Sequence, residues 1–282
     1  MNILSYIIWN VDPRIIPGLE YFRWYGLFWA LGIVSAYQVM LTFYKKEGLL
    51  QADLDRLTTY LIIGILVGAR LGHILFYDPV YYWENPMEIL PFRINPSFEF
   101  TGLAGLASHG GVLGAFLALF LYIKKYKISL LWALDRLAIA ASLLGSFIRF
   151  GNLMNSEIIG VQSSVPWAFV FTRVDQVPRH PAQLYEALFY FLIFILLLFF
   201  KRSEVAQNHK GLLFGAGFTL IFVQRFLVEF FKEDQVAFEA GLILNMGQLL
   251  SIPLIIIGTI IFSRSLMRPS ETDAEYDTST LN

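Results

Sequence analysis

The sequence contains no cysteine and little charge. Without cysteine, the chain has no disulfide, no thiolate metal site and no cysteine nucleophile of its own. Charged residues make up 15% of the 282 positions, whereas soluble proteins carry roughly a quarter. The formal net charge is −1, so no global field favours nucleic acid as a partner. The composition therefore argues against both a soluble protein and a nucleic-acid-binding protein.

Long apolar runs take the place of charge. The sequence is 56% hydrophobic, with a mean hydropathy of +0.58. Runs near twenty residues recur, and each is long enough to cross ~30 Å of hydrocarbon as a helix. We predict an all-α polytopic membrane protein, with residues 22–265 forming one bundle of about seven transmembrane helices. The predicted spans are residues 22–44, 55–76, 104–123, 130–148, 183–200, 211–231 and 246–263.

Basic residues predict the orientation of this bundle. They follow the first, third, fifth and seventh predicted spans, as the pairs or clusters Lys45 and Lys46; Lys124, Lys125 and Lys127; Lys201, Arg202 and Lys210; Arg264 and Arg268. The positive-inside rule places these ends in the cytoplasm, with the N-terminus outside and the C-terminus cytoplasmic. No basic residue precedes the first short apolar run, which makes the N-terminus a poor signal peptide.

Four segments outside the spans complete the predicted organisation. Residues 1–21 are expected at the outer interface, where tyrosine and tryptophan suit headgroup depth. The connections 77–103 and 149–182 fall outside and are predicted to form a small extracytoplasmic cap and an interfacial arm. Residues 266–282 are polar and acidic, and we expect a disordered cytoplasmic tail.

The second predicted span carries glycines at four-residue spacing. Gly64, Gly68 and Gly72 form one smooth ridge, which predicts the close approach of another helix. Arg70 and His73 lie on one face of the same span. A packing helix with polar anchors is the alternative to a functional role for this face.

Several polar groups occur where lipid should not tolerate them. An uncompensated charge at the bilayer centre costs roughly 2.5–3.5 kcal/mol on insertion scales. The stretch RFGNLMNSE, residues 149–157, gathers Arg149, Asn152 and Glu157 after an apolar run, and we predict a binding loop turned at Gly151. In the sixth span, Arg225 and Glu229 share a helix face.

Each of these groups also has a structural interpretation. His109 lies among glycines in SHGG, where it is either a proton acceptor near neutral pH or a hydrogen-bonded residue of a tightly packed helix. Arg225 and Glu229 either bind a ligand or neutralise each other within the bundle. Lys232, three residues beyond Glu229, is expected to snorkel to the surface.

The arginines predict an anionic ligand. Arg70, Arg149, Arg179 and Arg225 all fall toward the predicted outer side, and guanidinium groups grip phosphate oxygens bidentately. A phospholipid headgroup, held while its acyl chains remain in the membrane, satisfies this pattern. The ligand spacing suggests no metal and no cofactor.

Three other classes of membrane protein compete with this interpretation. A transporter or flippase more often has repeated halves and broken helices near the midplane, and neither pattern is visible. An intramembrane serine protease needs a catalytic serine with its base, but Ser108 beside His109 lacks a nucleophile elbow. A structural scaffold leaves the polar groups unexplained.

The segment RFGNLMNSEIIG resembles the signature of the prolipoprotein diacylglyceryl transferases, which is roughly G-R-x-G-N-F-x-N-x-E-x-x-G. The resemblance covers about residues 20–265, because further motifs follow in the family's order. They are WYGL at 24–27, GARLGHILFY at 68–77, SHGG at 108–111, RHPAQLYE at 179–186, RFLVEFF at 225–231 and MGQLLSIP at 246–253.

The resemblance implies an activity and its partners. Members of this family transfer the diacylglyceryl group of phosphatidylglycerol to the lipobox cysteine thiol in the signal peptide of a prolipoprotein. A thioether forms and glycerol phosphate leaves, in the first step of bacterial lipoprotein maturation. The family acts in the bacterial plasma (inner) membrane, among membrane lipid, with the active site toward the outer face. Since the thiol belongs to the substrate, a chain without cysteine is compatible with this chemistry.

The resemblance also implies site residues. The expected catalytic residues are Tyr25, His109, Arg149 and Arg225. The expected phosphatidylglycerol-binding residues are Arg149, Asn152, Glu157, Gly160, Arg225 and Glu229. In this interpretation His109 is the general base for the thiol. The two arginines stabilise the leaving phosphate, held in place by Glu157 and Glu229. The chain departs from the family pattern at Ile148, Leu153, Ile221 and Lys232.

Overall fold

The chain divides into two compact units. In the computed structural model, one unit comprises residues 1–40 and 131–282, and the other comprises residues 41–130. The structure describes residues 6–19, 22–90, 92–93, 98–100, 105–233 and 243–268. Most of the predicted tail, from residue 269, lies outside the described residues, as do parts of segments 1–21 and 77–103.

Helices occupy every predicted span. They are α1 (Trp24–Lys46), α2 (Gln51–Phe76), α4 (Ser108–Tyr126), α5 (Leu130–Asn155), α6 (Ala182–Phe200), α8 (Leu212–Glu229) and α9 (Met246–Leu266). Among the described residues, six helices are long and apolar enough to cross a membrane, and α4 is not one of the six. The prediction of an all-α, multi-pass membrane protein is confirmed.

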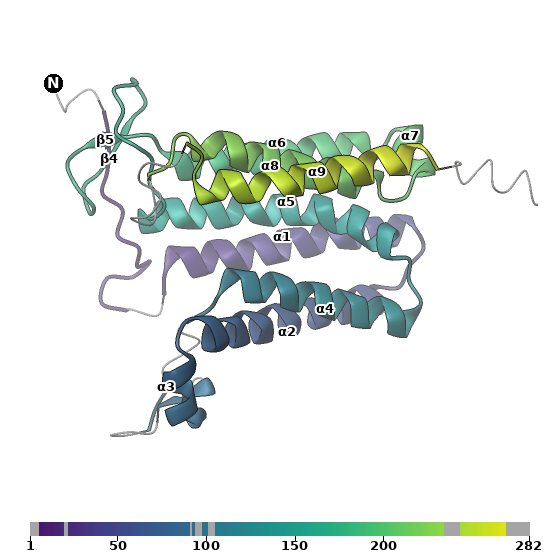
Figure 1. The fold of residues 1–282 in the computed structure, drawn as a ribbon, viewed down its shortest axis with the longest axis horizontal. Coiled ribbons are helices and arrows are strands. Elements are labelled where there is room, and N and C mark those ends of the chain that lie inside the picture. The colour runs from purple at the N-terminus through teal and green to yellow at the C-terminus, as the bar shows by residue number, and fades with distance from the viewer. Residues whose placement is uncertain are drawn as a thin grey trace, which may run out of the picture. The chain divides into compact units, whose positions relative to one another are not determined.

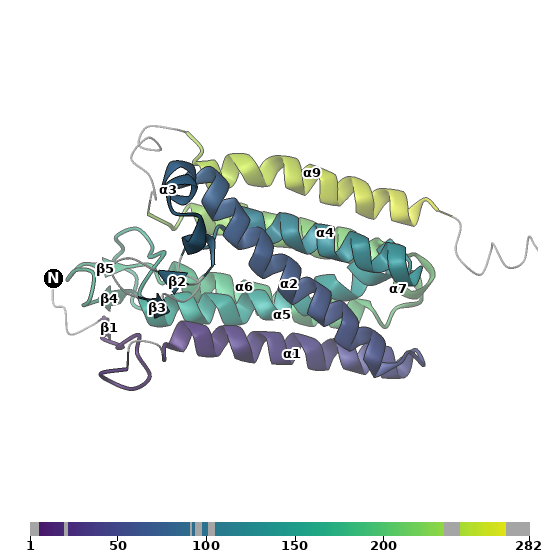
Figure 2. The same cartoon turned by 90° about the horizontal axis from the view of Figure 1, so that it is seen from below.

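Glycine lets the helices of the larger unit pack closely. A side chain at Gly145 of α5 would meet the Tyr190 ring of α6 at 2.8 Å, and one at Gly217 of α8 would meet Leu197 of α6 at the same distance. α8 and α9 also lie along each other (Figure 1), and α1 lies along α5 (Figure 2). Because small residues allow this approach, backbone packing can hold the bundle together in lipid.

A small sheet covers one end of the larger unit. Its strand order is β1 (Ile7–Trp9), β4 (Phe169–Phe171) and β5 (Pro178–Arg179), with β1 parallel to β4 and β4 antiparallel to β5. The Trp9 indole Nε1 donates to the carbonyl oxygen of Leu153, near the end of α5, over 3.1 Å. Residues 7–9 thus pair with the segment between α5 and α6. A short helix, α7 (Glu204–Asn208), follows α6.

The predicted loop at the start of RFGNLMNSE is wrong. α5 continues through Asn155, and Gly151 is a buried contact: a side chain there would lie 2.9 Å from the Tyr25 ring of α1. The chain turns instead at Ser156 and Ile158, whose φ values are 55° and 58°. Left-handed backbone is strained for a β-branched residue such as isoleucine, so surrounding contacts must hold this turn.

The smaller unit contains the predicted glycine ridge. A side chain at Gly72 of α2 would meet the Cα atom of Gly110 in α4 at 2.8 Å, and one at Gly64 would meet the Gly114 carbonyl oxygen at 2.6 Å. Reciprocal glycines therefore bring α2 and α4 backbone to backbone, as the ridge predicted. α3 (Pro79–Glu84), the 3₁₀ helix η2 (Pro86–Ile89), β2 (Phe92–Arg93) and β3 (Glu99–Phe100) form the connection between them.

Arg70 anchors this connection. Its guanidinium group donates to the backbone oxygens of Glu88 (2.5 Å) and Ile89 (3.0 Å) and lies over the Tyr82 ring. The structure thus gives Arg70 a structural role in place of the expected position beside a headgroup.

We predict that Gly68→Ala destabilises the smaller unit. The added methyl group would contact the Gly110 carbonyl and lie 2.8 Å from the Cα atom of Gly114, and overpacking of this kind costs about 1–3 kcal/mol. Thermal unfolding in detergent measures the loss. Gly26→Ala is the matched control, because nothing lies within 4 Å of its added methyl group. Equal unfolding temperatures for the two variants would contradict the role of the ridge.

Candidate functional site

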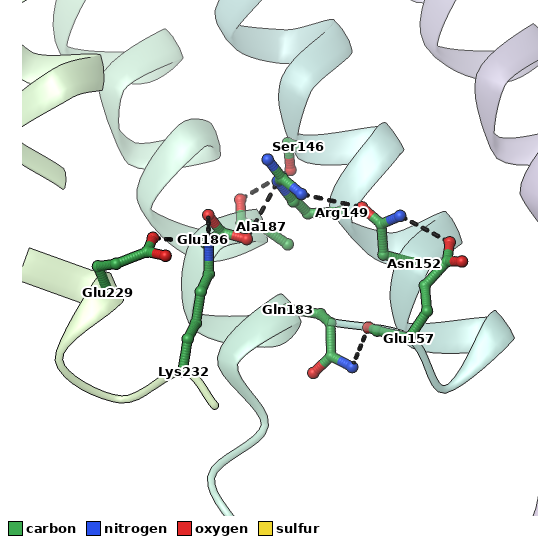
Figure 3. A network of polar contacts seen from close by, with 9 residues as sticks. All are labelled: Ser146, Arg149, Asn152, Glu157, Gln183, Glu186, Ala187, Glu229 and Lys232. Atoms are coloured by element: carbon green, nitrogen blue, oxygen red, sulfur yellow. Dashed lines mark hydrogen bonds and ion pairs between the residues drawn. The ribbon is translucent and has the colours of Figure 1, made fainter. Parts of the chain in front are cut away.

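A network of charged and amide side chains lies at the sheet-covered end of the larger unit. α5 ends there, α6 begins there and α8 ends there (Figures 1 and 3). The network joins residues far apart in the sequence: Arg149 and Asn152 of α5, Glu157 in the following turn, Gln183 and Glu186 of α6, Glu229 of α8, and Lys232.

Arg149 is held on two sides of its guanidinium group. Its Nε forms an ion pair with Glu186 Oε2 at 3.1 Å. Its Nη1 donates to Asn152 Oδ1 over 3.2 Å. Asn152 is one helical turn further along α5, so the helix itself supplies the right spacing. The orientation of Arg149 is therefore fixed by neighbours on two helices.

Glu157 reaches Arg149 through an amide. Asn152 Nδ2 donates to Glu157 Oε1 over 2.8 Å, and Asn155 Nδ2 donates to the same oxygen over 3.3 Å. Gln183 of α6 donates to the backbone carbonyl of Glu157 over 2.6 Å. These bonds hold the strained turn. Asn152 lies between the Glu157 carboxylate and Arg149. The sequence had led us to expect a direct contact of Glu157 with an arginine.

Lys232 is buried within the network. Its side-chain nitrogen lies 2.9 Å from Glu186 Oε1 and 3.2 Å from Glu229 Oε2, and the residue is 6% exposed. The expectation that Lys232 snorkels is wrong. Breaking a buried pair by removing one partner typically costs about 3–5 kcal/mol, because the other charge stays buried. Gly247 at the start of α9 packs against Glu229, where any larger side chain would meet the carboxylate.

Arg225 differs from Arg149 in having no such partners. It is half-buried on α8, one turn before Glu229. Within the part of the chain that the structure describes, no side chain or carbonyl forms a hydrogen bond or ion pair with its guanidinium group. Both Arg225 and Arg149 interact electrostatically with the Tyr190 hydroxyl. Glu229 thus forms its ion pair with Lys232, and not with Arg225 as the sequence had led us to expect.

Arg179 is occupied by structural contacts. Its guanidinium group forms ion pairs with Asp175 (2.6 Å) and Glu233 (2.7 Å) and donates to the Gly160 carbonyl oxygen. The hydrogen bond from Arg179 lowers the pKa of Asp175 below its usual range. Of the four arginines that the sequence grouped, Arg149 and Arg225 therefore remain for a ligand.

Gly160 allows the segment after α5 to lie against His180 and against the residues that follow α8. Its amide donates to the carbonyl oxygen of His180 over 3.1 Å, and it forms a bridge with Lys232. A side chain at Gly160 would lie 2.6 Å from the carbonyl oxygen of Phe231. The position thus needs glycine for close backbone approach. His180 bonds to the Tyr185 hydroxyl (3.0 Å), and burial lowers the pKa of His180.

Tyr25 and His109 occupy equivalent positions on their helices. Each is the second residue of its helix, α1 and α4 respectively. Tyr25 packs on Gly151 and interacts electrostatically with Arg149. His109 is exposed and belongs to the smaller unit.

Three polar residues of α6 were missed as site residues. Gln183, Glu186 and Tyr190 recur at i, i+3 and i+7, which is one helix face. That periodicity within an apolar span was the available signal. Among the described residues, no group of three or more His, Cys, Asp or Glu side chains is placed to hold a metal ion.

Comparison with known proteins identifies the family of this chain. The sequence profile of a family described as prolipoprotein diacylglyceryl transferase matches residues 15–264. A phosphatidylglycerol–prolipoprotein diacylglyceryl transferase of Bacteroides fragilis is 48% identical, over 91% of this chain and 94% of the relative. Proteins of the same name from Tolumonas auensis and Chloroherpeton thalassium are 45% and 43% identical. These matches cover 90% and 94% of this chain, and 96% and 97% of the relatives. The chain belongs to the prolipoprotein diacylglyceryl transferase family.

Proposed function

We propose that this protein transfers the diacylglyceryl group of phosphatidylglycerol to the cysteine thiol of a prolipoprotein. The observation that carries this proposal is a pair of arginines, Arg149 of α5 and Arg225 of α8, toward the sheet-covered end of the larger unit. Arg149 is fixed in orientation, and no described side chain or carbonyl forms a hydrogen bond or ion pair with the Arg225 guanidinium group. Two such groups at the end of a membrane bundle suit a phosphate that is attached to acyl chains in the bilayer.

The expected site residues have distinct proposed roles in binding phosphatidylglycerol. Arg149 and Arg225 contact the phosphate, and Asn152 contributes to headgroup recognition while Glu157 orients it. Glu229 balances charge beside Lys232. Gly160 contributes by letting the segment after α5 lie against the end of α8.

The opposite end of the larger unit supports an orientation. Lys201 and Arg202 follow α6, and Lys210 precedes α8, whereas the network lies where α6 begins and α8 ends. By the positive-inside rule the basic end is cytoplasmic. We therefore place the network at the outer face of the bacterial inner membrane, with the N-terminus outside and the C-terminus cytoplasmic.

In the proposed reaction, His109 accepts the proton of the lipobox cysteine in the signal peptide. The resulting thiolate attacks the glycerol carbon that bears the phosphate ester, so that a carbon–sulfur bond forms and the carbon–oxygen bond breaks. The electron pair leaves on glycerol phosphate, whose developing charge is stabilised by Arg149 and Arg225. Tyr25, which packs on Gly151 of α5, assists in placing the reacting groups.

We predict that Arg149→Ala lowers transfer about 10²-fold or more, as loss of a group that stabilises transition-state charge typically does. Arg149→Lys should also be impaired. The planar guanidinium group can contact Glu186, Asn152 and a phosphate at the same time, whereas the compact ammonium group of lysine lacks this forked geometry. The measurement is transfer of labelled diacylglyceryl from phosphatidylglycerol to a lipobox peptide by purified protein in detergent. Arg264→Lys, at an exposed arginine of α9, is the matched control.

Normal turnover by folded Arg149→Ala would contradict the proposed role of Arg149. No transfer by folded wild-type protein would contradict the reaction itself.

We predict a pH-dependent defect for His109→Ala. A general base contributes about 10²–10⁴-fold to rate, and a free thiol ionises near pH 8.5 without help. The deficit of His109→Ala relative to wild type should therefore shrink as the pH rises from 7 to 9.5, whereas that of Arg149→Ala should persist. A deficit of His109→Ala that is the same at every pH would exclude His109 as the base for the thiol.

A further inference from the structure

Four charges alternate in sign along the buried part of the network. Arg149 contacts Glu186 Oε2 at 3.1 Å, Lys232 contacts Glu186 Oε1 at 2.9 Å, and Lys232 contacts Glu229 Oε2 at 3.2 Å (Figure 3). Glu186 is 1% exposed, so water cannot replace either of its partners. Lys232 contacts both Glu186 and Glu229, and among the described residues its ammonium group is the one cation that links these two carboxylates.

The position of Lys232 determines which cation Glu229 pairs with. Arg225 and Glu229 are four residues apart on α8, a spacing at which opposite charges pair on a helix. Glu229 instead contacts Lys232, and the Arg225 guanidinium group forms no hydrogen bond or ion pair among the described residues. Without the ammonium group, a buried carboxylate would take the nearest available cation.

We infer that Lys232 is a positioning residue, which keeps Arg225 available to an anionic headgroup by occupying Glu229 and steadies Arg149 through Glu186. The inference rests on the proposed function for the identity of the ligand as phosphatidylglycerol. Lys232 itself contacts no substrate in this proposal, because both of its carboxylate contacts lie within the protein and it is almost fully buried.

The kinetic test is Lys232→Met, which keeps a long side chain and removes the charge. We expect the KM for phosphatidylglycerol to rise at least about tenfold, as loss of a charged hydrogen-bonding group does, while the KM for the lipobox peptide stays near its wild-type value. Lys232→Arg should stay close to wild type for both, because it restores the charge. Lys46→Met, at an exposed lysine of α1, is the matched control. An unchanged KM for the lipid, or equal rises for lipid and peptide, would overturn the inference.

A double-mutant cycle tests the competition for Arg225 directly. With Glu229→Gln already in place, no carboxylate remains at position 229 to capture Arg225. Adding Lys232→Met should then raise the KM for phosphatidylglycerol much less than it does in the wild-type background. Equal effects in the two backgrounds would overturn the inference.

Lipid-dependent unfolding separates this inference from the reaction and from a folding defect. Phosphatidylglycerol in mixed micelles should raise the unfolding temperature of wild-type protein and of Lys46→Met, relative to micelles with phosphatidylcholine. Lys232→Met should lose at least about half of this shift, and Lys232→Arg should keep it. A full shift in Lys232→Met would overturn the positioning role. If wild-type protein shows the lipid shift without transferring the lipid, the proposed reaction fails and the positioning role of Lys232 stands.

Discussion

The candidate site depends on the ion pairs that the buried Glu186 carboxylate forms with Arg149 and Lys232. The carboxylate lies between Arg149 of α5 and Lys232 after α8, and so it joins three parts of the bundle through one side chain. A carboxylate at this depth is tolerated only with cations beside it. The same requirement fixes both cations and, in the proposed function, the side of the bundle on which the phosphate binds.

Glycine supplies the second constraint. Gly151 brings Tyr25 against α5, Gly247 brings α9 against Glu229, and Gly160 brings the segment after α5 against the end of α8. A membrane bundle gains little from the hydrophobic effect between helices, since lipid is as apolar as their side chains. Close backbone contact therefore does two tasks at once, because it holds the helices together and brings their polar side chains within hydrogen-bonding distance.

The turn after α5 joins these two constraints. Ser156 and Ile158 hold left-handed backbone that neither residue favours, and Gln183 of α6 bonds to the carbonyl between them. The strain is maintained by contacts from another helix. Glu157, the residue at the centre of the turn, is thereby fixed against Asn152 and indirectly against Arg149.

The sequence by itself determined the membrane class, the positions of the helices, the glycine ridge of α2 and the family, since apolar length, four-residue spacing and motif order are local properties of a chain. It also identified Arg149, Asn152, Glu157, Arg225 and Glu229 as candidates, because polar residues in an apolar span need a reason. Only the tertiary structure decided which partner each one has. Glu186 and Lys232 are 46 residues apart, and no sequence spacing predicts a contact over that separation. Arg70 and Arg179 are excluded from the proposed ligand site for the same reason, since backbone carbonyls and carboxylates brought close by folding already bind their guanidinium groups.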